Sequence, residues 1–216
     1  KTITPKKESS ENINKLIEEV QFRDKTNSPS TIVGNATKIK KYLLNNHLQI
    51  LDIKGLNKIV ELDKKNFTVE VESGISIKEL KQQLLAENLH LDVPDMEGTI
   101  GGLIATKSYL FVRDIVLGIN LLLTDGSVAV FGGKVVKNVA GYDVLKLICG
   151  SWGSFGIILT ATLKLSAQPF KKEPPSGVQM KMFKPNKYHK MLKKVFDEKN
   201  LFNPWIFKED SLELRV

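Results

Sequence analysis

Three glycine-rich stretches constrain most strongly how this chain can fold. They are Gly34–Lys38, Gly98–Gly102 and residues 150–158. Glycine lets the backbone approach a ligand closely and adopt positive φ angles, and free N–H groups at a loop or helix start then point toward an anion. Two such loops facing each other would bind a diphosphate without a lysine. Each loop taken singly is more typical of an ordinary turn, and none matches the Rossmann or P-loop fingerprint.

The spacing of apolar residues predicts an α+β fold with two parts. Helix and strand patterns alternate up to about residue 95, and glycine loops with β-strands follow. The four residues from Ser76 to Glu79 form a capping box that opens a helix lined by Ile77, Leu80, Leu84 and Leu85, and Asp125-Gly126 predicts a hairpin turn. The predicted strands are 31–33, 47–53, 58–62, 67–72, 115–123, 128–132 and 156–165, and the predicted helices begin near 10, 76, 142 and 187.

The C-terminal helix predicted over 187–199 has an apolar face that we expect to pack on the rest of the fold, with its lysines in water. A cluster of large apolar residues follows the helix, and it suits either packing or a partner interface. The helix face consists of Tyr188, Met191, Leu192, Val195 and Phe196, and the cluster of Phe202, Trp205, Ile206 and Phe207.

The net charge of +8 raises the question of nucleic-acid binding, but most of the excess is local. Residues 171–199 contain nine lysines and three acids, with no arginine. Nucleic-acid grooves usually offer arginine forks and stacking rings, so we expect a solvated face or an acidic partner, and no nucleic acid.

The single cysteine, Cys149, lies in an apolar run and is expected to be buried. No apolar run is long enough to span a membrane and no signal peptide is recognised, so a cytoplasmic protein is expected.

The most specific segment is residues 132–143, Gly-Gly-Lys-Val-Val-Lys-Asn-Val-Ala-Gly-Tyr-Asp, followed by the glycine-rich residues 150–158. Together with Gly98–Gly102 and Arg113–Gly118, this segment resembles the glycolate oxidase FAD-binding subunit of the FAD-linked oxidase superfamily. The resemblance covers roughly residues 30–167. It implies a two-lobed FAD-binding domain of the p-cresol methylhydroxylase type, with a small α/β lobe, an antiparallel-sheet lobe with helices, and a short C-terminal helical extension.

The same resemblance implies the domain limits and the cofactor site. The FAD-binding domain would cover residues 1–169, with lobes of about 1–95 and 96–169, and residues 170–216 would be a linker, helix and tail in place of a cap domain. The FAD pyrophosphate would lie between the first two glycine loops. The implied cofactor-binding residues are Gly34, Asn35, Ala36, Thr37, Lys38, Gly98, Thr99, Ile100, Gly101, Gly102, Asn138, Gly141, Tyr142, Asp143, Gly156, Ile157 and Ile158.

By this resemblance the chain is expected to be the FAD-binding subunit of a multisubunit 2-hydroxy-acid oxidase or dehydrogenase of the glycolate type. A larger flavoprotein or an iron–sulfur subunit would be its partner and would complete the substrate site. No catalytic base is identified, because His47, His90 and His189 each suit a surface or structural role better, and no metal-ligand spacing is present.

Two departures from the family pattern motivate an alternative function, and a third concerns the cap domain. Val33, Asn35 and Ala36 replace an arginine and two glycines of the family's first loop, and the segment before Arg113 is short. The cap domain is also missing, and residues 192–204 resemble the family's closing motif, so the chain reads as a whole protein without its cap. The alternative is a non-catalytic structural subunit that kept the fold and lost the flavin.

Overall fold

Two β-sheets form the centre of the molecule, in a computed structural model that describes residues 7–39, 49–133, 144–169 and 185–207. The smaller sheet is parallel and pairs two strands, and the larger sheet is antiparallel with the strand order β3-β4-β7-β5-β6. The mixed α+β class predicted from the sequence is confirmed. The strands are β1 (Thr31–Val33), β2 (Ile50–Asp52), β3 (Ile59–Asp63), β4 (Thr68–Glu72), β5 (Val116–Leu122), β6 (Val128–Gly132) and β7 (Ile157–Lys164).

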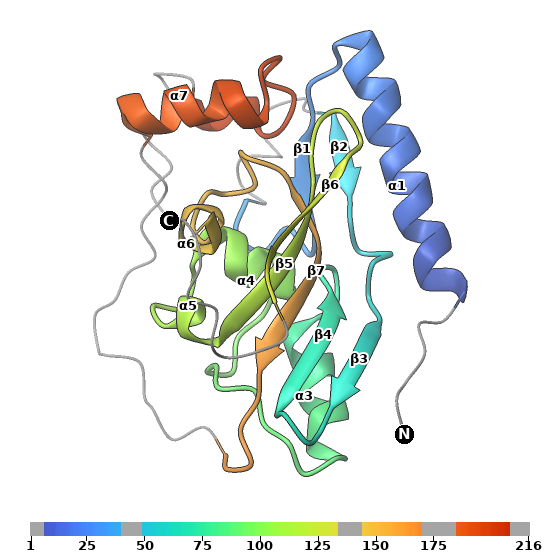
Figure 1. Cartoon of the computed structure of the whole chain (residues 1–216), viewed down its shortest axis with the longest axis vertical. Coiled ribbons are helices and arrows are strands. Elements are labelled where there is room, and N and C mark those ends of the chain that lie inside the picture. Colours follow the sequence, from blue (N-terminus) through green and yellow to red (C-terminus); the bar gives the residue numbers. More distant parts are fainter. Residues whose placement is uncertain (1–6, 40–48, 134–143, 170–184, 208–216) are drawn as a thin grey trace.

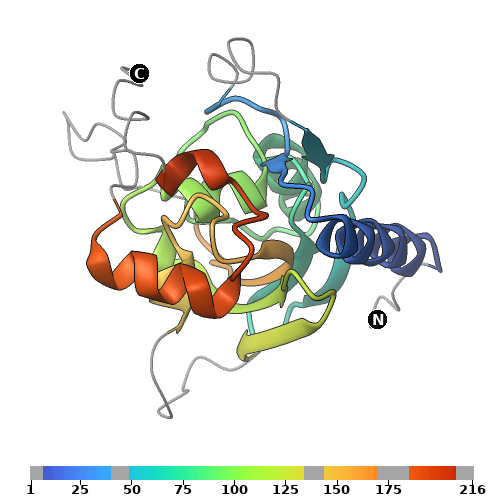
Figure 2. The same ribbon diagram turned by 90° about the horizontal axis from the view of Figure 1, so that it is seen from above.

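Helices surround the sheets (Figure 1), and one of them, near the C-terminus, crosses the top of the molecule. Helix α1 runs beside β1 and β2, α3 lies behind β3 and β4, and the view from above shows α7 over the end of the fold (Figure 2). The helices are α1 (Lys7–Thr26), α3 (Ile77–Leu85), α4 (Ile100–Thr106), α5 (Val112–Ile115), α6 (Val144–Ile148), α7 (Lys187–Phe196) and the 3₁₀ helix η1 (Pro204–Phe207).

Local turn and cap chemistry produces the features that the sequence predicted best. The β3–β4 hairpin forms around Asp63, whose carboxylate accepts the N–H groups of Lys65 and Asn66. The Asp125 carboxylate accepts the N–H of Ser127 in the β5–β6 turn. The Ser76 hydroxyl accepts the N–H of Glu79, 3.0 Å away, and caps α3. These contacts join residues two or three positions apart, so the local sequence suffices to predict them.

Strand β7 differs from the half-buried strand that its alternating residues predict. It lies between β4 and β5 and is buried on both faces along nearly its whole length. Its register against β5 shifts where Asn120 pairs with Thr160 but Leu121 pairs with Ile158, so Leu159 is an extra residue. Such a bulge reverses which face the following side chains point to. The alternation predicts that Ile157, Leu159, Ala161, Leu163 and Leu165 share one face. This was wrong: the first two enter one core and the last three enter the other.

The two hydrophobic cores lie on opposite sides of the large sheet. The larger core packs the sheet against α3, α4, α5 and α6, and the smaller core packs α1 against β2 and the upper ends of β5 and β7. Cys149 is buried in the larger core, as expected, whereas Leu85 of α3 is exposed, contrary to the prediction. The large sheet joins β3 and β4 to later strands across the lobe boundary expected near residue 95. The division into domains and lobes stays a prediction.

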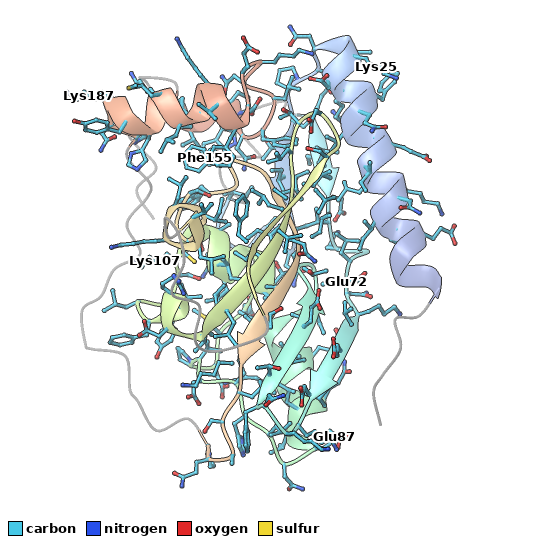
Figure 3. All side chains as sticks on the ribbon, in the orientation of Figure 1. Lys25, Glu72, Glu87, Lys107, Phe155 and Lys187 are labelled. Atoms are coloured by element: carbon cyan, nitrogen blue, oxygen red, sulfur yellow. The ribbon has the colours of Figure 1, made fainter. Side chains whose placement is uncertain are left out.

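Helix α7 presents a different face to the fold from the one predicted. Tyr188, Met191 and Val195 are exposed, and Val195 has 79% of its surface in solvent. Phe196 instead packs on Phe155, with ring centroids 5.7 Å apart, and Figure 3 shows Phe155 beneath the helix. The buried face also contains a lysine, so the predicted division into a packed apolar face and a wet lysine face was wrong.

The segment after α7 packs into the fold. Phe202, Trp205 and Ile206 are almost fully buried, which favours packing over an interface for these three residues. Residues 201–203 lie along the edge of β1 that faces away from β2: Ser30 donates its N–H to the Leu201 carbonyl at 2.7 Å.

In the part of the chain that the structure describes, no helix has the length and apolar character to cross a bilayer.

Candidate functional site

A pocket forms where the three glycine-rich segments meet. Its walls include the loop after β1, the turn before α4 with that helix along its length, and residues 152–158. It contains about 770 Å³ of space, a figure that includes space open to solvent. Among the described residues that line the pocket, Lys38 and Glu97 are the ones with charged side chains. The described pocket is therefore built to bind, with little acid–base chemistry of its own.

The first loop, Gly34–Lys38, lies directly against the second. A Cβ atom on Gly34 would come within 2.7 Å of the Thr99 hydroxyl oxygen, so glycine is what allows the two loops to touch. Ala36 has a φ of 56°, a left-handed conformation that glycine and asparagine adopt more readily than alanine. The backbone N–H groups of Asn35, Ala36 and Thr37 donate to no acceptor within the described residues. These N–H groups are therefore available to a ligand.

The second loop offers fewer donors than its glycine content predicts. Thr99 caps α4, and its hydroxyl accepts the N–H of Gly102 at 3.1 Å. The N–H of Ile100 donates to the Ile75 carbonyl at 3.0 Å, and that of Gly101 to the Ser73 carbonyl at 2.7 Å. The first turn of the helix is thus already hydrogen-bonded to the segment before α3. The N–H groups of Gly98 and Thr99 have no acceptor among the described residues, so they are the donors that remain here.

The predicted site residues divide into three groups. Of the thirteen predicted residues that the structure describes, twelve line the pocket, and the other, Ile100, lies in the core. Ile157 and Ile158 form part of its apolar wall. Asn138, Gly141, Tyr142 and Asp143 lie outside the described residues. The role of every one of these residues in binding stays a prediction.

Several residues that line the pocket were not predicted as part of it, among them Trp152, Asn203 and Trp205. The two indole rings meet edge to face, with centroids 6.2 Å apart and planes at 90°. Trp152 lies inside a recognised glycine motif, but Asn203 and Trp205 are about fifty residues further along the chain. The sequence offered one indication that this segment matters, namely the similarity of residues 192–204 to the family's closing motif. That similarity does not predict that the segment lines a pocket.

The described residues fit a flavin dinucleotide. The close approach of Gly34 to Thr99 makes a narrow cradle of main chain, and at least five N–H groups around it have no acceptor among the described residues. Beside the cradle, the aromatic and branched side chains of Trp152, Ile157, Ile158 and Trp205 form an apolar wall. A diphosphate needs the first feature and a planar ring system the second.

The fold and the pocket define a class of protein: an α+β domain with a pocket between glycine loops. The family model described as "FAD binding domain" matches residues 9–132, more than half of the chain, and the chain belongs to this family. The family predicted from the sequence is confirmed.

Two relatives that the chain resembles are oxidoreductases by name. The chain is 34% identical over 134 residues to glycolate oxidase subunit GlcD of Bacillus subtilis (strain 168), covering 57% of this chain and 28% of the relative. It is 34% identical over 131 residues to a D-lactate dehydrogenase of Anaerostipes hadrus, covering 56% of this chain and 27% of that enzyme. The chain thus spans less than a third of the length of either relative.

A solved structure supports the fold. Alkyldihydroxyacetonephosphate synthase superimposes with a TM-score of 0.59 at 23% identity, over 71% of this chain and 30% of that one.

Proposed function

We propose that this chain binds FAD in the pocket between Gly34–Lys38 and Gly98–Gly102 and serves as the FAD-binding subunit of a 2-hydroxy-acid oxidase or dehydrogenase of the glycolate or lactate type. The observation that carries the proposal is the contact between the two loops at Gly34 and Thr99, in a chain of the FAD-binding family. FAD when bound supplies the redox chemistry, and the protein supplies position, polarity and access.

Each wall of the pocket has its own task in this proposal. The N–H groups of Asn35, Ala36 and Thr37, with those of Gly98 and Thr99, bind the pyrophosphate oxygens, and Lys38 adds a positive charge at the same loop. The apolar wall keeps water from one side of the ring system. The predicted contacts of Asn138, Gly141, Tyr142 and Asp143 with the cofactor remain part of the proposal.

The substrate site needs groups that the described pocket does not offer. Glu97 is exposed, and no histidine of the described chain lines the pocket. A residue that removes a proton from a 2-hydroxy acid must lie within hydrogen-bond reach of it. We therefore propose that a partner subunit, either a larger flavoprotein or an iron–sulfur protein, completes the substrate site and accepts the electrons.

Titration with FAD tests the binding function directly. Visible absorption bands near about 370 and 450 nm in the purified protein, or a higher melting temperature with added FAD, would support it. Gly34→Ala should weaken FAD binding about tenfold, because the new Cβ displaces Thr99 from its cap position. Gly55→Ala is the matched control, because its Cβ would meet nothing closer than Asn12 at 3.8 Å.

The alternative of a structural subunit without flavin rests on two observations. Ala36 is in a left-handed conformation in the first loop, and the first turn of α4 has no N–H group left for an anion. A colourless protein whose melting temperature does not respond to FAD, alone or with its partner, would favour this alternative and refute the proposal.

A further inference from the structure

The side chain of Asn203 joins two walls of the pocket that are far apart in the sequence. Its Oδ1 accepts the N–H of Ile32 at 2.9 Å, and its Nδ2 donates to the Trp152 carbonyl at 2.5 Å. Asn203 is 3% exposed, and it, Ile32 and Trp152 all line the pocket. The amide is thus a buried bridge between the strand that leads into the first loop and the segment that leads into β7.

Asparagine suits this position for a reason of backbone geometry as well as of hydrogen bonding. Asn203 donates its own N–H to the Ser30 carbonyl at 2.9 Å and has a φ of 46°, a left-handed conformation that asparagine tolerates. Its side-chain oxygen then takes the place that a carbonyl of a third strand would have beside Ile32. Alanine offers neither partner, and aspartate keeps the acceptor but turns an oxygen toward the Trp152 carbonyl.

Trp152 lies at one end of this bridge and lines the pocket. It is 5% exposed, has a φ of 55°, and packs edge to face on Trp205. Its indole N–H is buried and has no hydrogen-bond partner within the described residues. Buried N–H groups are rarely left unpaired in folded proteins, so this donor has a role that the described protein contacts do not fill.

We propose that Asn203 is a positioning residue of the flavin pocket: it sets the separation of the Gly34–Lys38 loop from Trp152, and it holds the Trp152 indole N–H as a donor to a polar atom of the bound flavin nucleotide. This inference rests on the proposed function. It makes the C-terminal segment, which follows α7, part of the cofactor site. Affinity for FAD then depends on the docking of residues 201–205.

The test measures FAD affinity in two asparagine variants of the same segment. Asn203→Ala is compared with Asn200→Ala, because Asn200 belongs to the same segment and has a similar φ of 53°, yet does not line the pocket. Quenching of tryptophan emission reports binding, since both tryptophans of the chain line the pocket. All titrations are made well below the melting temperature of the least stable variant.

We expect Asn203→Ala to weaken FAD binding about tenfold, the equivalent of one net hydrogen bond, and Asn200→Ala to leave it within about twofold. Asn203→Asp should bind FAD no better than Asn203→Ala. Trp152→Phe, which removes the indole N–H, should also weaken binding. Adding Asn203→Ala to it should cost clearly less than the product of the two single effects, because Asn203 acts through Trp152.

Three results would overturn the inference. The first is an equal loss of FAD affinity in Asn203→Ala and Asn200→Ala. The second is an unchanged FAD affinity in Asn203→Ala, and the third is that the effects of Asn203→Ala and Trp152→Phe on FAD affinity are independent. If the wild-type protein does not bind FAD, the proposed function fails, and this inference fails as a statement about flavin. Near-ultraviolet circular dichroism then tests the positioning alone: the signal of the tryptophan pair should be lost in Asn203→Ala and kept in Asn200→Ala.

Discussion

Replacing Lys193 with methionine should destabilise the fold far more than an ordinary lysine substitution. Lys193 lies on the buried face of α7 and is 5% exposed. Its ammonium group donates to the Ser154 carbonyl at 2.7 Å, and to the Phe202 carbonyl and the Asp197 carboxylate at 2.6 Å each. Burial lowers the pKa of Lys193, and Asp197 acts in the opposite direction. The group is thus desolvated but well paired.

The magnitude follows from what the substitution leaves behind. Asp197 is 1% exposed and would keep only the N–H groups of Leu201 and Phe202 as partners, 2.7 and 2.8 Å away. Removing one member of a buried ion pair costs about 3–5 kcal/mol, because the other charge stays buried and uncompensated. For a chain of this length that corresponds to a fall in melting temperature of roughly 6–20 °C.

Urea denaturation followed by circular dichroism measures the free energy of unfolding of Lys193→Met and the wild-type protein. Lys199→Met is the control, because Lys199 pairs with Asp24 at the surface, where such pairs contribute about 0–1 kcal/mol. A loss below about 1 kcal/mol for Lys193→Met, or equal losses in the two variants, would refute the assignment of a buried pair that stabilises the C-terminal segment.

Two further predictions concern α7. Val195→Lys should change the free energy of unfolding by no more than about 0.5 kcal/mol, because Val195 is exposed, and a larger loss in a urea titration would contradict the face that we assign to the helix. Burial lowers the pKa of His189 below 6.5, and its Nδ1 accepts the N–H of Asn186 in a capping box. Unfolding therefore takes up a proton just below pH 6.5, and stability should fall as the pH falls through that window. His189→Gln keeps an acceptor at this position without titrating, so its stability, measured by urea titration between pH 7 and 5, should lack this part of the pH dependence.

Features set by neighbours in the chain were predicted correctly. The β3–β4 and β5–β6 hairpins depend on the carboxylates of Asp63 and Asp125, and the start of α3 depends on the hydroxyl of Ser76. In each case the side chain and the N–H group that it accepts are two or three residues apart. Propensity and turn chemistry therefore carry enough information to predict the element.

Features set by distant partners were predicted less well. A periodic apolar pattern assigned Tyr188, Met191 and Val195 to the packed side of α7, but the fold packs the helix through Phe196 and Lys193. A lysine can be buried there only because Ser154 and Phe202 supply carbonyls from other segments. The alternation in β7 likewise could not reveal the extra residue Leu159, because a bulge exists only relative to the neighbouring strand.

By itself, the sequence determined the family, the α+β class, the hairpins and the glycine segments that meet at the pocket, because each depends on a recognisable motif or on contacts between near neighbours. Only the tertiary structure decided which N–H groups remain for a ligand, since Ser73 and Ile75 accept those of Gly101 and Ile100. It alone also brought Asn203 into the pocket wall, 171 residues from its partner Ile32. Hydrogen bonds between such distant residues form only when the chain has folded, and no local pattern specifies them.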